Sequence, residues 1–102
     1  MSRVGFVEQS PGVFQLSGVL DYLSGPALRE QGARLIAAST ASTCVVDCGA
    51  VEKSSSVGLS LLLAFTRDAQ RASKTLSVRA LPNDMREIAR VSGLLDILPQ
   101  AD

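Results

Sequence analysis

The sequence contains no histidine and no tryptophan, and its charges balance, with 10 Lys plus Arg against 10 Asp plus Glu in 102 residues. Without histidine, the Ser-His and Cys-His pairs of nucleophilic catalysis and zinc-histidine sites are excluded. A protein that holds nucleic acid through its phosphates usually carries a basic excess, and this chain carries none. Neither G-x-x-x-x-G-K-[ST] nor G-x-G-x-x-G occurs. The sequence therefore predicts no enzyme, no metal site, no bound cofactor and no nucleic-acid partner.

Long hydrophobic runs are also missing. The longest run, Leu61 to Phe65, has five residues, against about 20 for a membrane-spanning helix. The first residues lack the apolar core of a signal peptide, and an acidic residue, Glu8, comes early. We therefore expect a cytoplasmic chain without a membrane span.

Cysteine is scarce as well: the chain has only Cys44 and Cys48. They lie four residues apart in a segment that has the pattern of a strand and its end, so their Cα atoms would be roughly 13 Å apart, beyond the ~7 Å limit for a disulfide. The spacing is not the C-x-x-C of redox or metal sites. Both are expected to be buried, reduced thiols that pack as small hydrophobic side chains.

The residues that are present favour a globular α/β domain. Hydrophobic residues make up 46% of the chain, enough for a core, and the length is typical of one domain covering residues 1–102. Alternation of apolar residues and turn signals predict strands over 4–8, 13–20, 43–47 and 76–81. Helical periodicity predicts helices over 25–38 and 57–73 and a last helix that begins at Asn83.

Turn and capping residues mark where these elements begin and end. Pro11-Gly12 predicts a hairpin between the first two strands. Ser24 and Asn83 are expected to cap helices, with Pro26 in a first helical turn and Gly93 at a left-handed helix end. The resulting order, β-β-α-β-α-β-α, predicts a mixed sheet: an initial antiparallel hairpin, then β-α units with parallel strands and helices as cover.

The helix after Ser56 has two faces when its residues are placed at about 100° per step. A core stripe is predicted for six residues: Gly58, Leu61, Leu62, Phe65, Ala69 and Ala72. Leu59 and Leu63 lie nearer the opposite side, together with Arg67. Two such leucines are either ordinary surface residues or part of a contact surface for a partner protein.

Three serines, Ser54, Ser55 and Ser56, precede this helix. A helix N-cap needs one serine, whose hydroxyl accepts a hydrogen bond from a free backbone N–H. The other two are either unremarkable small polar residues or part of the same contact surface.

The segment VVDCGAVEKSSSVGLSLLLAF resembles the core motif of STAS domains, the fold of anti-sigma-factor antagonists. In that motif a strand ends in Asp, and an Asp-Ser/Thr-x-Gly-Leu turn opens a helix. Asp47 matches the strand-end Asp, Ser56 the Ser/Thr position, and Gly58-Leu59 the Gly-Leu pair.

The resemblance extends over nearly the whole chain. FQLSGVLDYLSGPALRE is similar to the hairpin strand and first helix of STAS domains, and NDMREIARVSGLLDILP to their last helix and its ending. The chain departs from the phosphorylation-switched members at one position: Ser55 stands where they carry Asp. Ser56 is therefore a possible phospho-acceptor by position only.

This resemblance implies a STAS-like mixed sheet with helices packed on one face, no catalysis and no cofactor. It also implies that the loop at Ser56 and the start of the next helix dock on a partner. Among STAS domains, the chain is most similar to the cytoplasmic subunits of phospholipid ABC transporters in Gram-negative bacteria, which would make the partner an ABC-transporter ATPase in a complex with an inner-membrane permease. The alternative is an anti-sigma-factor antagonist that is phosphorylated on Ser56. The expected partner-binding residues are Ser54, Ser55, Ser56, Val57, Leu59, Leu63 and Arg67.

Overall fold

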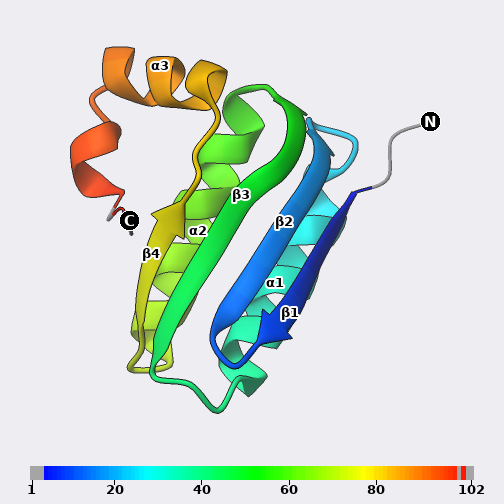
Figure 1. The fold of residues 1–102 in the computed structure, drawn as a ribbon, viewed down its shortest axis with the longest axis vertical. Coiled ribbons are helices and arrows are strands. Elements are labelled where there is room, and N and C mark those ends of the chain that lie inside the picture. Colours follow the sequence, from blue (N-terminus) through cyan, green and yellow to red (C-terminus); the bar gives the residue numbers. More distant parts are fainter. Residues whose placement is uncertain (1–3, 99, 101–102) are drawn as a thin grey trace.

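The order of helices and strands is the predicted one. A computed structural model describes residues 4–98 and 100. Its elements are β1 (Gly5–Ser10), β2 (Val13–Leu20), α1 (Gly25–Ala38), β3 (Thr43–Ser54), α2 (Ser56–Arg71), β4 (Thr75–Arg79), α3 (Asn83–Val91) and the short 3₁₀ helix η1 (Leu95–Ile97). The strands form one sheet in the order β1-β2-β3-β4, antiparallel between β1 and β2 and parallel from β2 to β4 (Figure 1). The α/β class and the mixed sheet are thus confirmed.

Two helices, α1 and α2, cover one face of the sheet, while α3 lies across its end (Figure 1). The core lies between the sheet and these helices, and β2 shows how the sequence builds it, since every second side chain of this strand is buried. Three rings pack together at its centre: Phe6 stacks on Phe14 with centroids 5.2 Å apart, and Phe6 contacts Phe65 at 4.8 Å.

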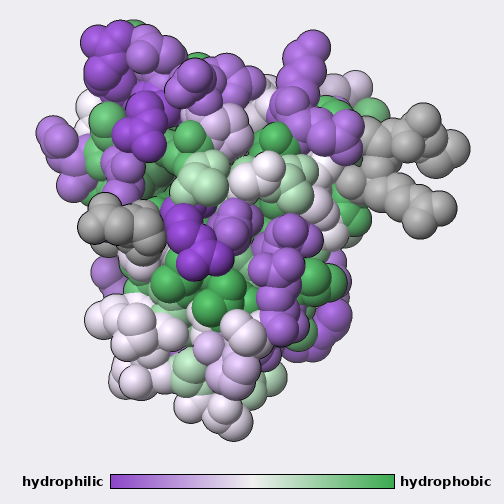
Figure 2. Space-filling model, in the orientation of Figure 1, coloured by the Kyte–Doolittle hydropathy of each residue, from purple (hydrophilic) through white to green (hydrophobic). Residues whose placement is uncertain are grey.

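The other face of the sheet is covered by none of the described helices, and Figure 2 shows hydrophobic and hydrophilic side chains side by side on it. Asp47 of β3 pairs there with Arg79 of β4, Oδ2 to Nη2 2.8 Å. The Gly49 N–H, which donates to Asp47, and the Arg79 guanidinium hold the pKa of the Asp47 carboxyl below its usual value. Asp47 thus joins neighbouring strands rather than ending one.

Strand β3 is longer than predicted, because it runs from Thr43 to Ser54 instead of stopping at Asp47. The predicted strand stops before Cys48-Gly49, because a glycine after an apolar run is typical of a turn. The structure instead accommodates this stretch with two register shifts against β2, at Gln15/Ser17 and Gly18/Val19, so that pairing continues to Leu20 and Ser54. The consequence is that the three serines come directly at the end of a central strand.

The predictions at element ends are partly right. Ser24 is the N-cap residue of α1 and Pro26 lies in the first turn, as predicted, but the Ser24 hydroxyl donates to the Val19 carbonyl (3.0 Å) and makes no capping hydrogen bond. Asn83 is the first residue of α3, and Pro82 occupies the N-cap position. Strand β4 ends at Arg79, and Ala80 is exposed with φ of 59°, because the chain turns there toward α3. The predicted left-handed Gly93, with φ of 74°, is confirmed.

Both cysteines are buried on the core side of β3, with no accessible surface, as predicted. Burial raises the pKa of Cys48 to about 12 and raises that of Cys44. At pH 8 the Cys48 thiol is therefore almost entirely protonated, and the thiolate is the reactive form.

We therefore expect neither cysteine of the folded protein to react with a thiol reagent such as Ellman's reagent within minutes at pH 8. Both should react at once in guanidinium chloride, which is the control. Fast labelling of either thiol without denaturant would contradict the burial of β3.

Candidate functional site

The three junctions that lead from a parallel strand into a helix lie at the same end of the sheet, because β2, β3 and β4 run in the same direction (Figure 1). These junctions are residues 21–24, Ser55 and residues 80–82. Carboxyl ends of parallel strands are the usual place for binding in open α/β sheets. The predicted serine cluster therefore lies where the fold gathers three loops.

The serines have three different environments. Ser54 ends β3, and its hydroxyl donates to the Ser55 carbonyl at 2.7 Å. Ser55 is the N-cap of α2: its hydroxyl accepts from the Val57 N–H (3.2 Å), and its backbone N–H donates to the Leu20 carbonyl (3.0 Å). Ser56, the first residue of α2, is exposed. Ser55, the residue that replaces Asp, thus holds the helix start in place and leaves Ser56 facing solvent.

Two glycines let the elements at this end approach closely. A Cβ on Gly58 would come within 3.1 Å of Leu20 Cδ1 and 3.0 Å of Met85 Cε, so the first turn of α2 lies directly on β2 and α3. A Cβ on Gly25 would lie 3.0 Å from Val57 Cγ1, which brings the start of α1 against the start of α2. The serine cluster is therefore next to a region where α1, α2, α3 and β2 pack tightly together.

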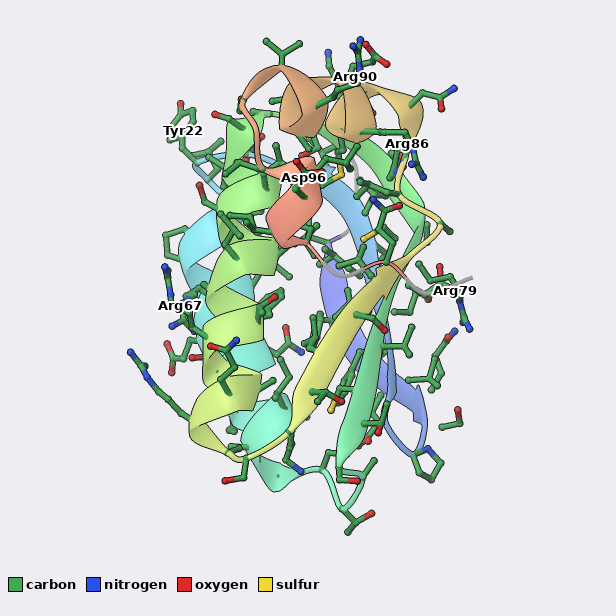
Figure 3. All side chains as sticks on the ribbon, turned by 90° about the vertical axis from the view of Figure 1, so that its left-hand side faces the viewer. Tyr22, Arg67, Arg79, Arg86, Arg90 and Asp96 are labelled. Carbon is green, nitrogen blue, oxygen red and sulfur yellow. The ribbon has the colours of Figure 1, made fainter. Side chains whose placement is uncertain are left out.

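The predicted exposure of Leu59 is wrong, because its side chain is only 2% exposed and belongs to the core. The prediction holds only if a single side of α2 is covered. In the structure a second side is covered too, because α3 and η1 lie beside the N-terminal half of α2, away from α1 (Figures 1 and 3). Leu59 is thus a core residue of the isolated domain, and its side chain is not accessible to a partner.

The other predicted contact residues of α2 reach the surface. Leu63 and Val57 are half-buried against the core, and Arg67 is exposed. Arg67 lies eleven residues after Ser56, about 16 Å along the helix axis. The structure therefore brings Ser54, Ser55, Ser56 and Val57 together at one end, with Leu63 and Arg67 further along α2.

Asp47 is not part of this group. It lies in the middle of β3, seven residues before Ser54, which corresponds to roughly 20 Å of extended strand. The strand-end role that the resemblance implied for it is wrong here, because β3 continues beyond it.

Two further exposed residues at this end were not predicted from the sequence. Tyr22 and Leu23, in the loop between β2 and α1, are 77% and 75% exposed. Figure 3 shows Tyr22 projecting from the molecule near the start of α2. An aromatic and an aliphatic residue next to a Ser-Gly-Pro turn are the sequence signal that could have identified them, because large apolar side chains are uncommon at loop tips.

The groups on this surface are ones that can contact a partner protein. Among residues 4–98 and 100, no group of three or more His, Cys, Asp or Glu side chains is placed to hold a metal ion. In the same described part of the chain, no helix is long and apolar enough to cross a membrane. The surface instead offers hydroxyls, a helix N-terminus and exposed apolar side chains.

Comparison with known proteins agrees with this description. Residues 6–99 match the family model described as "Mlab, STAS domain". No match was found among curated proteins.

Solved structures with the same fold come from two groups. A chain of the Acinetobacter MlaFEDB complex in its ATP-bound Vtrans2 conformation superposes with a TM-score of 0.83 and 19% identity, covering 96% of this chain and 100% of that one. An anti-sigma factor antagonist from Mycobacterium paratuberculosis gives 0.78 and 27%, covering 96% and 85%. The phosphorylated Bacillus cell fate determinant SpoIIAA gives 0.67 and 17%, covering 98% and 92%.

The four-stranded mixed sheet with helices on one face is thus shared with these solved structures. The chain belongs to the STAS domain family, in the branch described as Mlab.

Proposed function

We propose that the chain is a non-catalytic, cytoplasmic STAS subunit that docks on the ATPase of a phospholipid-transporting ABC complex and stabilises or regulates it. The observation that carries the proposal is the match along the full length of a chain of the MlaFEDB complex, supported by the Mlab description of the family. In this proposal the partner is an MlaF-like ATPase, and the subunit reaches the inner membrane only through that partner and its permease.

The docking surface in this proposal comprises Ser54, Ser55, Ser56, Val57, Leu63 and Arg67, extended by Tyr22 and Leu23. Apolar side chains near the centre of such a surface contribute most to affinity when a partner covers them. The half-buried Leu63 and the exposed loop pair suit that role, whereas Arg67 suits the polar rim.

A second candidate function is that of an anti-sigma-factor antagonist regulated by phosphorylation of Ser56. The observation that favours it is the exposure of Ser56 at the first position of α2, where helix N-termini stabilise a phosphate. The 27% identity to the mycobacterial antagonist adds support. The Ser55 that replaces Asp favours the transporter subunit over this candidate.

Replacing Leu63 with Asp is expected to reduce co-purification of the transporter ATPase by at least tenfold, because a carboxylate would be buried against the partner without a counter-charge. Ser56→Glu should weaken the complex too, since it adds a charge at the same surface. The measurement is affinity purification of the tagged chain from its native host, with the ATPase quantified by mass spectrometry.

Gln70→Glu, an exposed change further along the same helix, is the matched control and should leave co-purification intact. Full recovery of the ATPase with a folded Leu63→Asp variant would rule out this surface. Recovery of an anti-sigma factor or a kinase in place of the ATPase, with the same dependence on Leu63, would decide for the second candidate.

A further inference from the structure

A groove runs between α1 and α2 on the side of the helices that faces away from the sheet. Its first hollow, of about 390 Å³, lies between the N-terminal halves of the two helices and is lined mainly by apolar side chains, among them Tyr22, Pro26, Val57, Leu61 and Ala64. A second hollow of about 370 Å³ follows along the same pair of helices, lined by Ala33, Ala37, Ala72, Asp68 and Arg71. Small side chains on both helices keep the groove open.

An ion pair stands between the two hollows. Arg29 lines the first and Asp68 the second, and their side chains form a two-pronged pair at 2.5 and 3.1 Å. Arg71 approaches the same carboxylate at 3.9 Å. Asp68 is thus neutralised by two arginines, which leaves positive charge beside the groove.

The helix layer as a whole is basic although the chain is neutral. The segments α1 and α2 contain four arginines and two acidic residues. Arg71 is 76% exposed, and Figure 3 shows Arg67 projecting from the same side of the molecule as Tyr22. Apolar hollows flanked by exposed guanidinium groups are complementary to a ligand with apolar anchors and carboxylates.

We propose that this groove binds an acidic amphipathic helix of a partner protein, with large apolar side chains in the first hollow and carboxylates directed at Arg67 and Arg71. The groove extends from Val57 to Ala72, which is about 22 Å along α2 and matches a helix of about 15 residues. The hollows are open to solvent along their length, whereas sites for small amphiphiles enclose most of their ligand. The groove therefore fits a peptide segment better than a free fatty acid.

This inference adds a second contact, which shares Tyr22, Val57 and Arg67 with the docking surface of the proposed function. It does not depend on which protein supplies the helix. The test therefore uses random peptides rather than a named partner.

The experiment selects a phage-displayed library of random 16-residue peptides on the immobilised full-length chain. Enriched sequences should be acidic, with apolar residues at helical spacing. Synthetic peptides of these sequences should bind in fluorescence anisotropy, and raising the salt from 50 to about 500 mM should weaken binding, because charges at a surface are screened.

Two variants test the site. Ser60, which is exposed and lines the first hollow, is replaced by Trp to fill it, and Arg71→Glu reverses the charge beside the second hollow. Each should weaken peptide binding at least tenfold. Ser60→Ala and Arg86→Glu on α3 are the matched controls and should bind as the unmodified chain does.

Several results would overturn the inference: no enrichment, enrichment of basic or uncharged peptides, or binding that survives both Ser60→Trp and Arg71→Glu. Stabilisation by decanoate that is lost in Ser60→Trp, without peptide enrichment, would assign the groove to a free amphiphile instead. Leu63→Ala separates the two hypotheses, because it removes an apolar contact of the docking surface without adding a charge beside Arg67. It should retain peptide binding even where it weakens recovery of the ATPase.

Discussion

Replacing Leu62 with Asp is expected to abolish folding. The Leu62 side chain has no accessible surface and belongs to the core cluster between the sheet and α2. Truncation of such a residue alone costs about 2–5 kcal/mol, and burying an unpaired carboxylate adds several more. The sum is comparable to the whole stability of about 5–15 kcal/mol expected for a small domain.

Leu63→Asp is the matched control, since it introduces the same charge one residue further along the same helix. Leu63 is half-buried, so the new carboxylate can reach water and the variant should melt cooperatively within a few degrees of the unmodified chain. Circular dichroism at 222 nm during thermal unfolding measures both. Equal loss of structure in the two variants would mean that α2 does not present the faces described above.

The fold could be predicted largely from local sequence patterns, because the secondary structure follows them. The alternation in residues 13–20, the Pro11-Gly12 turn and the helical stripe around Leu62 and Phe65 each depend on periodicity within a few residues. Burial in the structure follows these patterns except at Ala72, which lies beyond the end of α2 and is half-buried. Their order along the chain then leaves few topologies.

The extent of β3 could not be predicted, because it depends on pairing between residues far apart in sequence. Gly49 looks like a strand end when only its neighbours are considered. Register shifts against β2 allow the strand to pass through this stretch and reach Ser54. The same long-range pairing places Asp47 in mid-strand and the serines at the strand end.

The contact surface was predicted in part. Ser56 and Arg67 are exposed as their positions indicated, whereas Leu59 is buried. A helical wheel gives the angle of a side chain but not the number of neighbours that surround the helix. Coverage of α2 from the side of α3 decides the environment of Leu59, and Tyr22 was missed because a loop has no periodicity to interpret.

Gly32→Ala is expected to destabilise the domain by about 1–3 kcal/mol, although the same change in an open helix stabilises it by about 1 kcal/mol. Gly32 lies in the middle of α1, and a Cβ there would overlap the Phe65 ring, whose Cδ1 would be 2.9 Å away. The ring cannot retreat, because it lies against Phe6, which in turn stacks on Phe14. Overpacking at this point therefore outweighs the gain in helix propensity.

The sign of the change in Tm shows whether overpacking against Phe65 or the gain in helix propensity is larger. At about 4–8 °C per kcal/mol for a domain of this size, thermal unfolding should show a Tm lowered by roughly 5–20 °C. The pair Gly32→Ala with Phe65→Leu should lose less stability than the two single changes added together, because the smaller side chain makes room for the methyl group. A Gly32→Ala variant with a raised Tm would show that α1 and α2 are not in close contact at Gly32 and Phe65.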